Sequence, residues 1–405
     1  MKCLTLALLS LLFLLERPAS ATSSRKVSLL GSTLIPDDTD LFMYPGAMGF
    51  HRNLVVLELG IDPFTGNGGI LLGWKRLTFG VFAHRTNALG EEASLPSDLD
   101  EMLELYGGGG APLQFELPAK LFDLLFAVKL MKGVHLGVDL GFAHSFWRNR
   151  DGSGESSTLS GEHTFSLGCV LGLSVRRVVF RNDLSLELLW NRIRDVQSDV
   201  LAARSSPQPS FTIADRLIVG EGKPLGWGLS VLLTRRDYSI KMPAAGEDWA
   251  GSRWIFRLGG GPRVEVGGML VASMELFGQA DLTLLEPLWE PPEPDEPDPD
   301  AGDGPENWQR WNVLVPGVRI SAEIRPAEWI RIRAAVEEQY RLNWQDDTNS
   351  FTTSNLFTWA LGIGFAWKGF AFDAAVAHEL FLKGPYFLTG NKSGFFSHVS
   401  VSYDW

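Results

Sequence analysis

The chain has 405 residues, of which 45% are hydrophobic, and its 48 acidic and 36 basic side chains give a net charge of −12. This acidic balance, together with the lack of a basic patch, argues against nucleic acid as a partner. Two cysteines are too few for a disulfide framework, so backbone hydrogen bonds and packing must hold the fold together.

The N-terminus has the three parts of a secretory signal peptide. Lys2 is followed by an apolar run from Cys3 to Leu15, and the small residues Ala-Ser-Ala end at Ala21. This run is shorter than the roughly 20 apolar residues of a transmembrane helix, which favours a cleaved signal at 1–21 over an anchor or a core helix. Cleavage would remove Cys3 and leave Cys169 alone, so no intramolecular disulfide is expected.

Residues 22–52 come before the first expected strand, and we expect them to form a periplasmic lead-in or a plug segment. Within them, the stretch IPDDTDLFMYP contains Asp37, Asp38 and Asp40. Three roles are open for these carboxylates. They could bind a cation, position a plug, or lie in a structured but inert lead-in, and the pattern favours the last role.

From residue 53 to 405, apolar and polar residues alternate in run after run. Val134–Phe142 and Phe357–Trp367 are clear examples. Successive side chains of a strand point to opposite faces, so each run predicts a strand with one apolar and one polar face. The runs last about ten residues, longer than the usual 5–6 of globular strands and suited to a tilted strand that crosses a bilayer.

The alternation predicts about sixteen strands, an even number as an up-and-down barrel requires. Their expected ranges are Asn53–Gly60, Gly69–Trp74, Leu77–Thr86, Lys120–Leu130, Val134–Phe146, Glu162–Val175, Val178–Arg192, Leu225–Leu233, Tyr238–Met242, Trp254–Val266, Met269–Leu282, Trp311–Ile324, Ile330–Leu342, Leu356–Trp367, Phe370–Leu382 and Phe395–Trp405. Residues 193–243 are ambiguous, because FTIADRLIVG (211–220) could be a further strand. Fourteen or eighteen strands therefore stay open.

The connections between these strands fall into two classes. The short ones are often basic, at 74–77, 131–133, 175–178, 234–237, 325–329 and 367–369. The long ones are polar and rich in Gly, Pro or Asp, at 87–118, 147–161, 193–223, 284–307, 343–354 and 383–394. Short periplasmic turns that alternate with long extracellular loops are typical of outer-membrane barrels.

One of these long loops is strongly acidic. The stretch from Glu290 to Glu306 carries eight carboxylates and many prolines. Such a composition cannot bury a core, so we expect a mobile loop. Binding of a divalent ion there is the alternative.

The C-terminal run VSVSYDW places Val399, Val401, Tyr403 and Trp405 on one parity. With the signal peptide and the alternating strands, this ending resembles the outer-membrane β-barrel proteins of Gram-negative bacteria. The resemblance implies that the barrel-assembly machinery recognises the last strand. It also implies a location in the outer membrane, among its lipid and lipopolysaccharide. The fold class is thus predicted to be all-β, a transmembrane antiparallel up-and-down barrel over residues 53–405.

The polar parity of the strands is expected to face the lumen. Burying so many ionisable groups in a dry core would cost several kcal/mol each, so we expect a water-filled interior unless a loop or the N-terminal segment plugs it. The predicted pore-lining residues are Lys129, His135, Asp139, Arg181, Asp183, Glu187, Arg319, Glu323, Arg331, Arg333, Glu337, Arg341, Asp373 and Glu379. Many of the fourteen Trp residues fall near strand ends, which predicts aromatic girdles at the two membrane interfaces.

One predicted hairpin, with its turn at RPAEW, gathers charges on the inward parity. In one register Glu323 faces Arg331. In the other it faces Arg333, and Arg319 faces Glu337. Either register puts opposite charges across the ladder, and each such pair contributes roughly 0.2–1 kcal/mol. Since basic groups outnumber acidic ones here, this wall is predicted to attract small anions.

Catalytic chemistry is sparse in the sequence. The seven His residues show no metal spacing, and there is no nucleophile elbow, phosphate-binding loop or Cys cluster, so neither a cofactor nor a metal is expected. The best candidate pair, His135 with Asp139, is better explained as two solvated lumen residues. We therefore predict a porin-like channel for passive diffusion of small hydrophilic solutes. The alternatives are a plugged structural or surface-binding barrel and, less favoured, an outer-membrane hydrolase.

Overall fold

The computed structural model describes twelve stretches of the chain. They are residues 23–37, 40–51, 53–60, 67–85, 120–151, 158–197, 200–205, 208–242, 247–287, 308–345, 350–376 and 396–405. The expected signal peptide, Glu379 and the acidic loop at 290–306 lie outside these residues. Among the described residues, no helix has the length and apolar character to cross a membrane.

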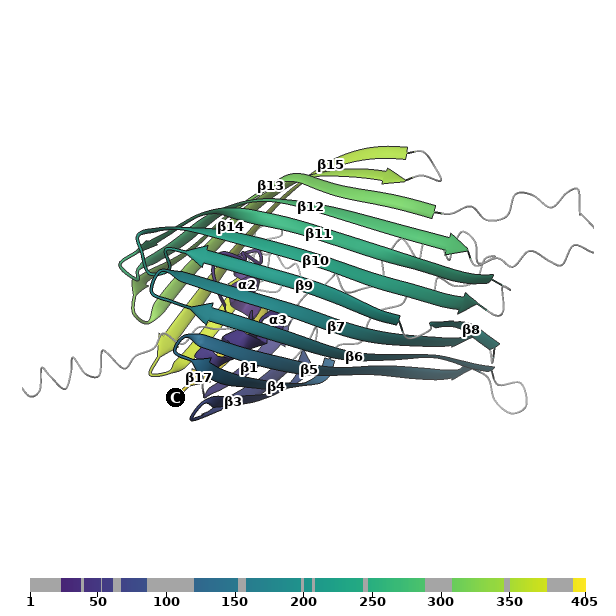
Figure 1. Cartoon of the computed structure of the whole chain (residues 1–405), viewed down its shortest axis with the longest axis horizontal. Helices are drawn as coiled ribbons and strands as arrows, with labels where there is room; N and C mark the ends of the chain where they lie inside the picture. Colours follow the sequence, from purple (N-terminus) through teal and green to yellow (C-terminus); the bar gives the residue numbers. More distant parts are fainter. Residues whose placement is uncertain are drawn as a thin grey trace, which may run out of the picture.

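The described strands form one antiparallel sheet that closes on itself, because β1 pairs with both β17 and β2 (Figure 1). The strands are β1 (Leu54–Gly60), β2 (Asn67–Trp74), β3 (Leu77–Arg85), β4 (Lys120–Met131), β5 (Val134–Asp151), β6 (Thr158–Arg176), β7 (Phe180–Gln197), β8 (Val200–Ser205), β9 (Gln208–Val219), β10 (Leu225–Met242), β11 (Glu247–Val266), β12 (Leu270–Pro287), β13 (Trp308–Ala327), β14 (Ile330–Gln345), β15 (Ser350–Trp367), β16 (Phe370–Val376) and β17 (Phe396–Asp404). The short β8 and the longer β9 both lie between β7 and β10, so they share one position. The barrel has sixteen strand positions, and the predicted fold class is confirmed.

The predicted number of strands is right although the list contains two errors, because one error adds a strand and the other omits one. The prediction of a turn at TRRD (234–237) is wrong, since these residues lie inside the single strand β10. Arg236 faces inward there, while Arg235 faces outward and pairs with Asp237 at 2.9 Å. The stretch contains no Gly or Pro, the two residues that most strongly favour a turn.

The expected long loop at 193–223 is also wrong, because most of it is occupied by β8 and β9. The chain instead turns at 220–224, between β9 and β10. Gly220 and Gly222 adopt φ values of 81° and 73° there, in the left-handed region that only glycine enters easily.

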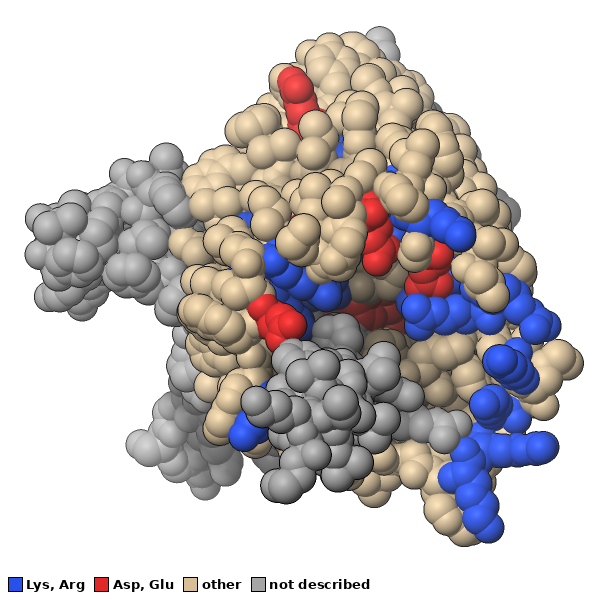
Figure 2. All heavy atoms as spheres, turned by 90° about the vertical axis from the view of Figure 1, so that its left-hand side faces the viewer, with Lys and Arg blue, Asp and Glu red and all other residues tan. Residues whose placement is uncertain are grey.

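Short connections gather at one end of the barrel, which we call the turn rim. It comprises 75–76, 132–133, 177–179, 220–224, 267–269, 328–329 and 368–369. The opposite end, the loop rim, carries longer connections such as the one between β3 and β4 (86–119). Acidic and basic side chains gather around a hollow in the face of the turn rim (Figure 2). The predicted segregation of loop lengths is present in part, because the strands extend into the expected loops and leave only 152–157, 243–246 and 346–349 at three of these connections.

The outer surface of the barrel is apolar. Leu57, Leu59 and Val81 are each about half exposed, and exposed Leu, Ile, Val and Phe side chains recur on the outward parity of the other strands. Trp74, Trp227, Trp329, Trp367 and Trp405 are exposed beside the turn rim. An apolar belt with an interfacial row of Trp suits lipid and would be unfavourable in water. The chain is therefore a transmembrane β-barrel of the outer-membrane type.

The first and last strands meet at the turn rim through backbone and side-chain hydrogen bonds. The Trp405 amide donates to the Asn53 carbonyl oxygen at 3.2 Å. The Asn53 side chain accepts from the Gly73 amide at 2.9 Å and donates to the Trp405 carbonyl oxygen at 3.3 Å. Asn53 thus joins β1, β2 and the C-terminal residue where the barrel closes.

The described helices that precede β1 lie inside the barrel, near its turn rim (Figure 1). They comprise α2 (Ser23–Ser28), α3 (Asp40–Met43) and the 3-10 helix η1 (Pro45–Phe50). Helix α2 contacts β14 to β17, whereas η1 contacts β3 to β7. We call residues 23–51 the lumen segment.

Candidate functional site: the lumen segment and its wall

Arg25 connects the lumen segment to the β13–β14 wall. Its Nε donates to Glu323 Oε2 at 2.8 Å, and its Nη1 donates to the Pro36 carbonyl oxygen at 2.8 Å. Glu323 also accepts from Arg333 Nε at 2.8 Å and from Arg325 Nη2 at 2.8 Å. Both Arg25 and Glu323 are buried. One carboxylate therefore holds three arginines, of which only one comes from the lumen segment.

Asp40 makes the corresponding contact with the opposite wall. It pairs with Arg216 on β9, and the Nη2 of Arg216 also donates to Asp183 Oδ2 on β7 at 2.7 Å. The guanidinium of Arg216 lies over the ring of Tyr44, 4.8 Å from the ring centroid. Burial by itself would raise the pKa of Asp40, but the nearby charges of Arg216 and Lys26 lower it below its ordinary value. Asp40 is therefore ionised at neutral pH.

A third set of contacts joins the stretch between α2 and α3 to β10, β12 and β13. The Thr33 hydroxyl lies 2.7 Å from Glu275 Oε1 and 3.1 Å from the Ser230 hydroxyl. The hydroxyl of Ser321 donates to the Leu29 carbonyl oxygen at 3.0 Å. These hydrogen bonds give partners to polar groups that would otherwise be buried without them.

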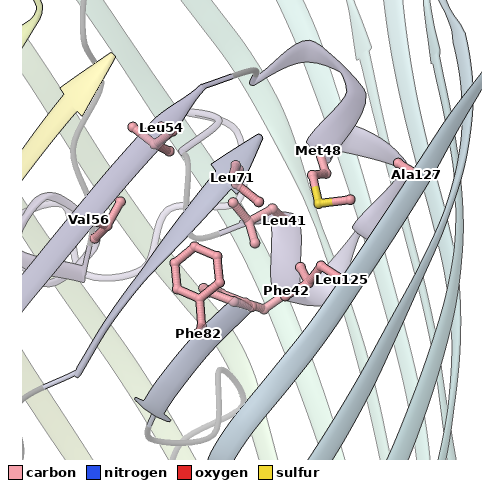
Figure 3. Close-up of a cluster of buried hydrophobic side chains, with 9 residues drawn as sticks. All are labelled: Leu41, Phe42, Met48, Leu54, Val56, Leu71, Phe82, Leu125 and Ala127. Atoms are coloured by element: carbon pink, nitrogen blue, oxygen red, sulfur yellow. The ribbon is translucent and has the colours of Figure 1, made fainter. Parts of the chain in front are cut away.

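A cluster of buried apolar side chains covers part of the inner face of β1 to β4 (Figure 3). Leu41, Phe42 and Met48 of the lumen segment pack there against a set of inward-facing side chains, and all of them are buried. The wall side of this cluster consists of Leu54, Val56, Leu71, Phe82, Leu125 and Ala127. Phe42 and Phe82 meet edge to face, with ring centroids 4.8 Å apart. Strand parity did not predict this cluster, because Leu71 and Phe82 face inward although they are apolar.

Glycines let η1 approach the β5–β6 wall closely. A Cβ on Gly137 would lie 2.2 Å from the Pro45 carbonyl oxygen, and one on Gly46 would lie 2.6 Å from the Ser174 amide nitrogen. Phe50 of η1 stacks edge to face on His135, with centroids 4.4 Å apart. His135 is thus an aromatic contact of the lumen segment, and His135 and Asp139 are both buried.

The predicted pore-lining residues all face inward where the structure describes them, but they differ in surroundings. Buried ones are His135, Asp139, Arg181, Asp183, Arg319, Glu323, Arg331, Arg333, Glu337 and Asp373. Lys129, Glu187 and Arg341 are partly exposed. Several buried ones form ion pairs, including Arg181 with Asp183 at 2.7 Å and Arg333 with Asp373. Beside the lumen segment, the buried residues of this set therefore contact other protein groups rather than water.

The hairpin at RPAEW has the second of the two predicted registers. Glu323 faces Arg333 and Arg319 faces Glu337 across the ladder, and both pairs are ion pairs. Glu323 and Asp373 thus balance the charge of Arg333, and attraction of anions to this wall stays a prediction.

The predicted C-terminal residues keep their parity in β17. Val401 and Trp405 are exposed, whereas Ser400 and Ser402 are buried on the lumen side. Tyr403 and Trp405 stack with ring centroids 5.7 Å apart. Recognition of this strand during assembly stays a prediction.

Sequence reasoning missed Arg25 and Arg216 and singled out Asp40 without its partner. The strand signal in FTIADRLIVG, which places Arg216 on the inward parity with Thr212 and Ala214, could have found one of them. Among the described residues, no group of three or more His, Cys, Asp or Glu side chains is arranged to hold a metal ion.

No protein-family model matches the chain, and no curated protein matches its sequence. Solved structures of similar form include a Pseudomonas aeruginosa FadL homologue, with 12% identity over 96% of this chain and 100% of that one and a TM-score of 0.41. Another is the Pseudomonas putida toluene transporter TodX, with 8% identity, 95% and 98% coverage and a TM-score of 0.41. A third is the FpvAI–pyocin S2 complex, with 8% identity and a TM-score of 0.38. The match covers 80% of this chain and 42% of the other.

Proposed function

We propose that this chain is an outer-membrane channel whose lumen is closed by residues 23–51, and that small polar solutes pass when this segment moves. The observation that carries the proposal is that the lumen segment contacts strands on several sides of the barrel. Helix α2 lies on β14 to β17, Asp40 reaches β9, Thr33 reaches β10 and β12, and η1 lies on β3 to β7. A segment that touches walls around the barrel blocks the path through it.

The ion pairs of the wall support a segment that can leave. If Arg25 departs, Glu323 still pairs with Arg333 and Arg325. If Asp40 departs, Arg216 still pairs with Asp183. Removing one partner of a buried pair usually costs about 3–5 kcal/mol, because it leaves a bare charge. Here the wall charges stay paired, and the released side chains become hydrated.

The apolar contacts support a closed resting state. Leu41, Phe42 and Met48 are buried against the β1–β4 wall. Burying a side chain of this size contributes roughly 1.5–3 kcal/mol relative to exposure in water. The same cluster is the observation that favours the second candidate, a barrel in which the segment never leaves and serves only stability.

Conductance in planar bilayers separates the two candidates. The double variant Arg25→Gln with Asp40→Asn removes both charged contacts of the segment without adding bulk, and it should show open steps far more often than the wild type. Arg235→Gln removes one charge from the outer face of β10, so it should behave like the wild type. Silent double-variant channels that are correctly folded would favour the permanently closed barrel.

A further inference from the structure

The inner wall of β10 to β14, on the loop-rim side of the lumen segment, carries an uneven charge. Strand register sets its inward side chains in rows that run across the five strands. On β10 to β13, the row nearest the loop rim consists of Arg236, Arg253, Thr283 and Arg310. The row nearest the lumen segment consists of Leu232, Arg257, Gln279, Leu314 and Arg341. Between them lie Thr234, Ile255, Asp281, Asn312 and Asn343.

These rows contain five arginines and a single carboxylate. That carboxylate, Asp281, is already paired with Arg253, whose Nε donates to its Oδ1 at 2.9 Å. Arg236 approaches Glu187 of β7, with 3.5 Å between Nη2 and Oε2, and Arg341 donates to the Gln339 side chain. Among the described residues of these rows, the arginines therefore outnumber the carboxylates that pair with them.

Arg257 is the least satisfied of the five. Its guanidinium lies over the ring of Phe277, 4.9 Å from the centroid. Its Nε and Nη2 are buried and make no hydrogen bond within the part of the chain that the structure describes. The Nε and Nη1 of Arg236 are likewise buried and make no hydrogen bond with the described residues. Buried donors without acceptors are costly, and guanidinium nitrogens match the spacing of oxygens in an oxyanion.

Arg257 also lies beside the lumen segment. Leu232, its cross-strand neighbour, packs against Tyr44 and Ala47. Phe277 contacts a second guanidinium, that of Arg319, at 5.0 Å, and Arg319 Nη1 donates to the Gly31 carbonyl oxygen at 3.3 Å. A solute held at Arg257 would therefore lie next to the segment that closes the lumen.

We infer that this wall binds small oxyanions, carboxylates or phosphate, and guides them from the row of Arg236 to the row of Arg257 and Arg341. The inference rests on the proposed channel function and names its solute class. Two levels of arginine suit passage, since an anion can exchange partners while charge-assisted hydrogen bonds form at each level. The polar Asn and Thr side chains of the middle row supply neutral hydrogen bonds on the way.

Binding of inorganic phosphate and of acetate to the full folded chain in detergent, measured by calorimetry, tests the inference without requiring transport. The wild type should bind, and Arg236→Gln with Arg257→Gln should weaken affinity by about tenfold or more, as expected for lost hydrogen bonds to a charged group. Arg235→Gln, on the outward parity of the same strand, should leave affinity unchanged. Loss of binding of only one probe would tell phosphate from carboxylate.

A double variant that keeps its heat-resistant fold and binds both anions as tightly as the wild type would overturn the inference, as would a wild type that binds neither. The binding measurement does not depend on whether the channel opens. If the release variant of the lumen segment stays silent while phosphate still binds at Arg257, the channel proposal fails and the anion site remains.

Discussion

Glu323 and Arg333 face each other across β13 and β14, with 2.8 Å between Oε2 and Nε, and both side chains are fully shielded from solvent. Arg25 of the lumen segment donates to the same carboxylate oxygen at 2.8 Å. The inner wall and the lumen segment therefore share one acceptor. In the proposed channel, stability of the barrel and closure of the lumen are linked through Glu323.

Replacing that acceptor should destabilise the barrel. Glu323→Gln would remove the carboxylate that Arg25, Arg325 and Arg333 share and would leave only Asp373 to pair with Arg333 and Asp37 to pair with Arg25, at a cost of up to roughly 3–5 kcal/mol. The free energy of unfolding, measured by urea titration in lipid vesicles, should fall accordingly. Glu328→Gln in the exposed turn between the same strands is the matched control and should change little. Equal losses in the two variants would contradict this assignment.

Acid should release the lumen segment. Burial raises the pKa of Asp40, but Arg216 and Lys26 outweigh it and lower the pKa below the ordinary value of 3.8. A lowered pKa means that the contact with Arg216 is complete above that value and is lost as the pH falls through the lowered pKa. Channel openings should therefore increase only below about pH 3.8.

The variant Asp40→Asn provides the control for this pH dependence. It should open more often than the wild type at neutral pH and should lose the part of the acid response that Asp40 supplies. A wild-type channel that opens with a midpoint near pH 6 would point to His titration and away from Asp40.

The close approach of η1 to the wall depends on Gly137. In Gly137→Ala the new Cβ would lie 2.2 Å from the Pro45 carbonyl oxygen, so η1 must shift away from β5. Chymotrypsin should then cleave more readily after Phe50. Gly278→Ala on β12 is the control, since its Cβ would meet only atoms at 3.5 Å, an ordinary contact. Identical cleavage rates in the two variants would show that η1 tolerates the extra methyl group.

The C-terminal residue should matter for assembly. Trp405 stacks on Tyr403 and bonds through its backbone to Asn53, at the point where the barrel closes. Deleting Trp405 should lower the yield of heat-modifiable barrel in the membrane far more than Ser402→Ala, which changes a buried lumen residue. Similar membrane yields for both variants would count against this role.

The inward and outward parity of the wall could be predicted from the sequence because the strand period of two is strict. It placed Glu323, Arg333 and Arg319 on the lumen face, and the tight turn limited their partners to two registers. The prediction was wrong in β10, because the basic stretch TRRD resembles the basic turns elsewhere in the chain. Local pattern alone does not distinguish a buried Arg236 from one in a turn.

The filling of the lumen could not be predicted in the same way. The contacts of Arg25 with Glu323 and of Asp40 with Arg216 join residues 298 and 176 positions apart. Parity shows that a side chain faces inward, but it does not show what it meets there. The sequence favoured an inert role for the carboxylates near Asp40, whereas the structure pairs Asp40 with the wall.

A reversible covalent link tests the closure of the lumen most directly. The hydroxyls of Ser32 on the lumen segment and Ser273 on β12 lie 3.2 Å apart. The pair Ser32→Cys and Ser273→Cys, with Cys169→Ser, can be introduced into the Arg25→Gln, Asp40→Asn channel. Single-channel current is then recorded while oxidant and reductant alternate. The account predicts closed channels when the disulfide is formed and open steps after reduction. Open steps of equal size and frequency in both states would show that solutes pass a seated segment, and would contradict it.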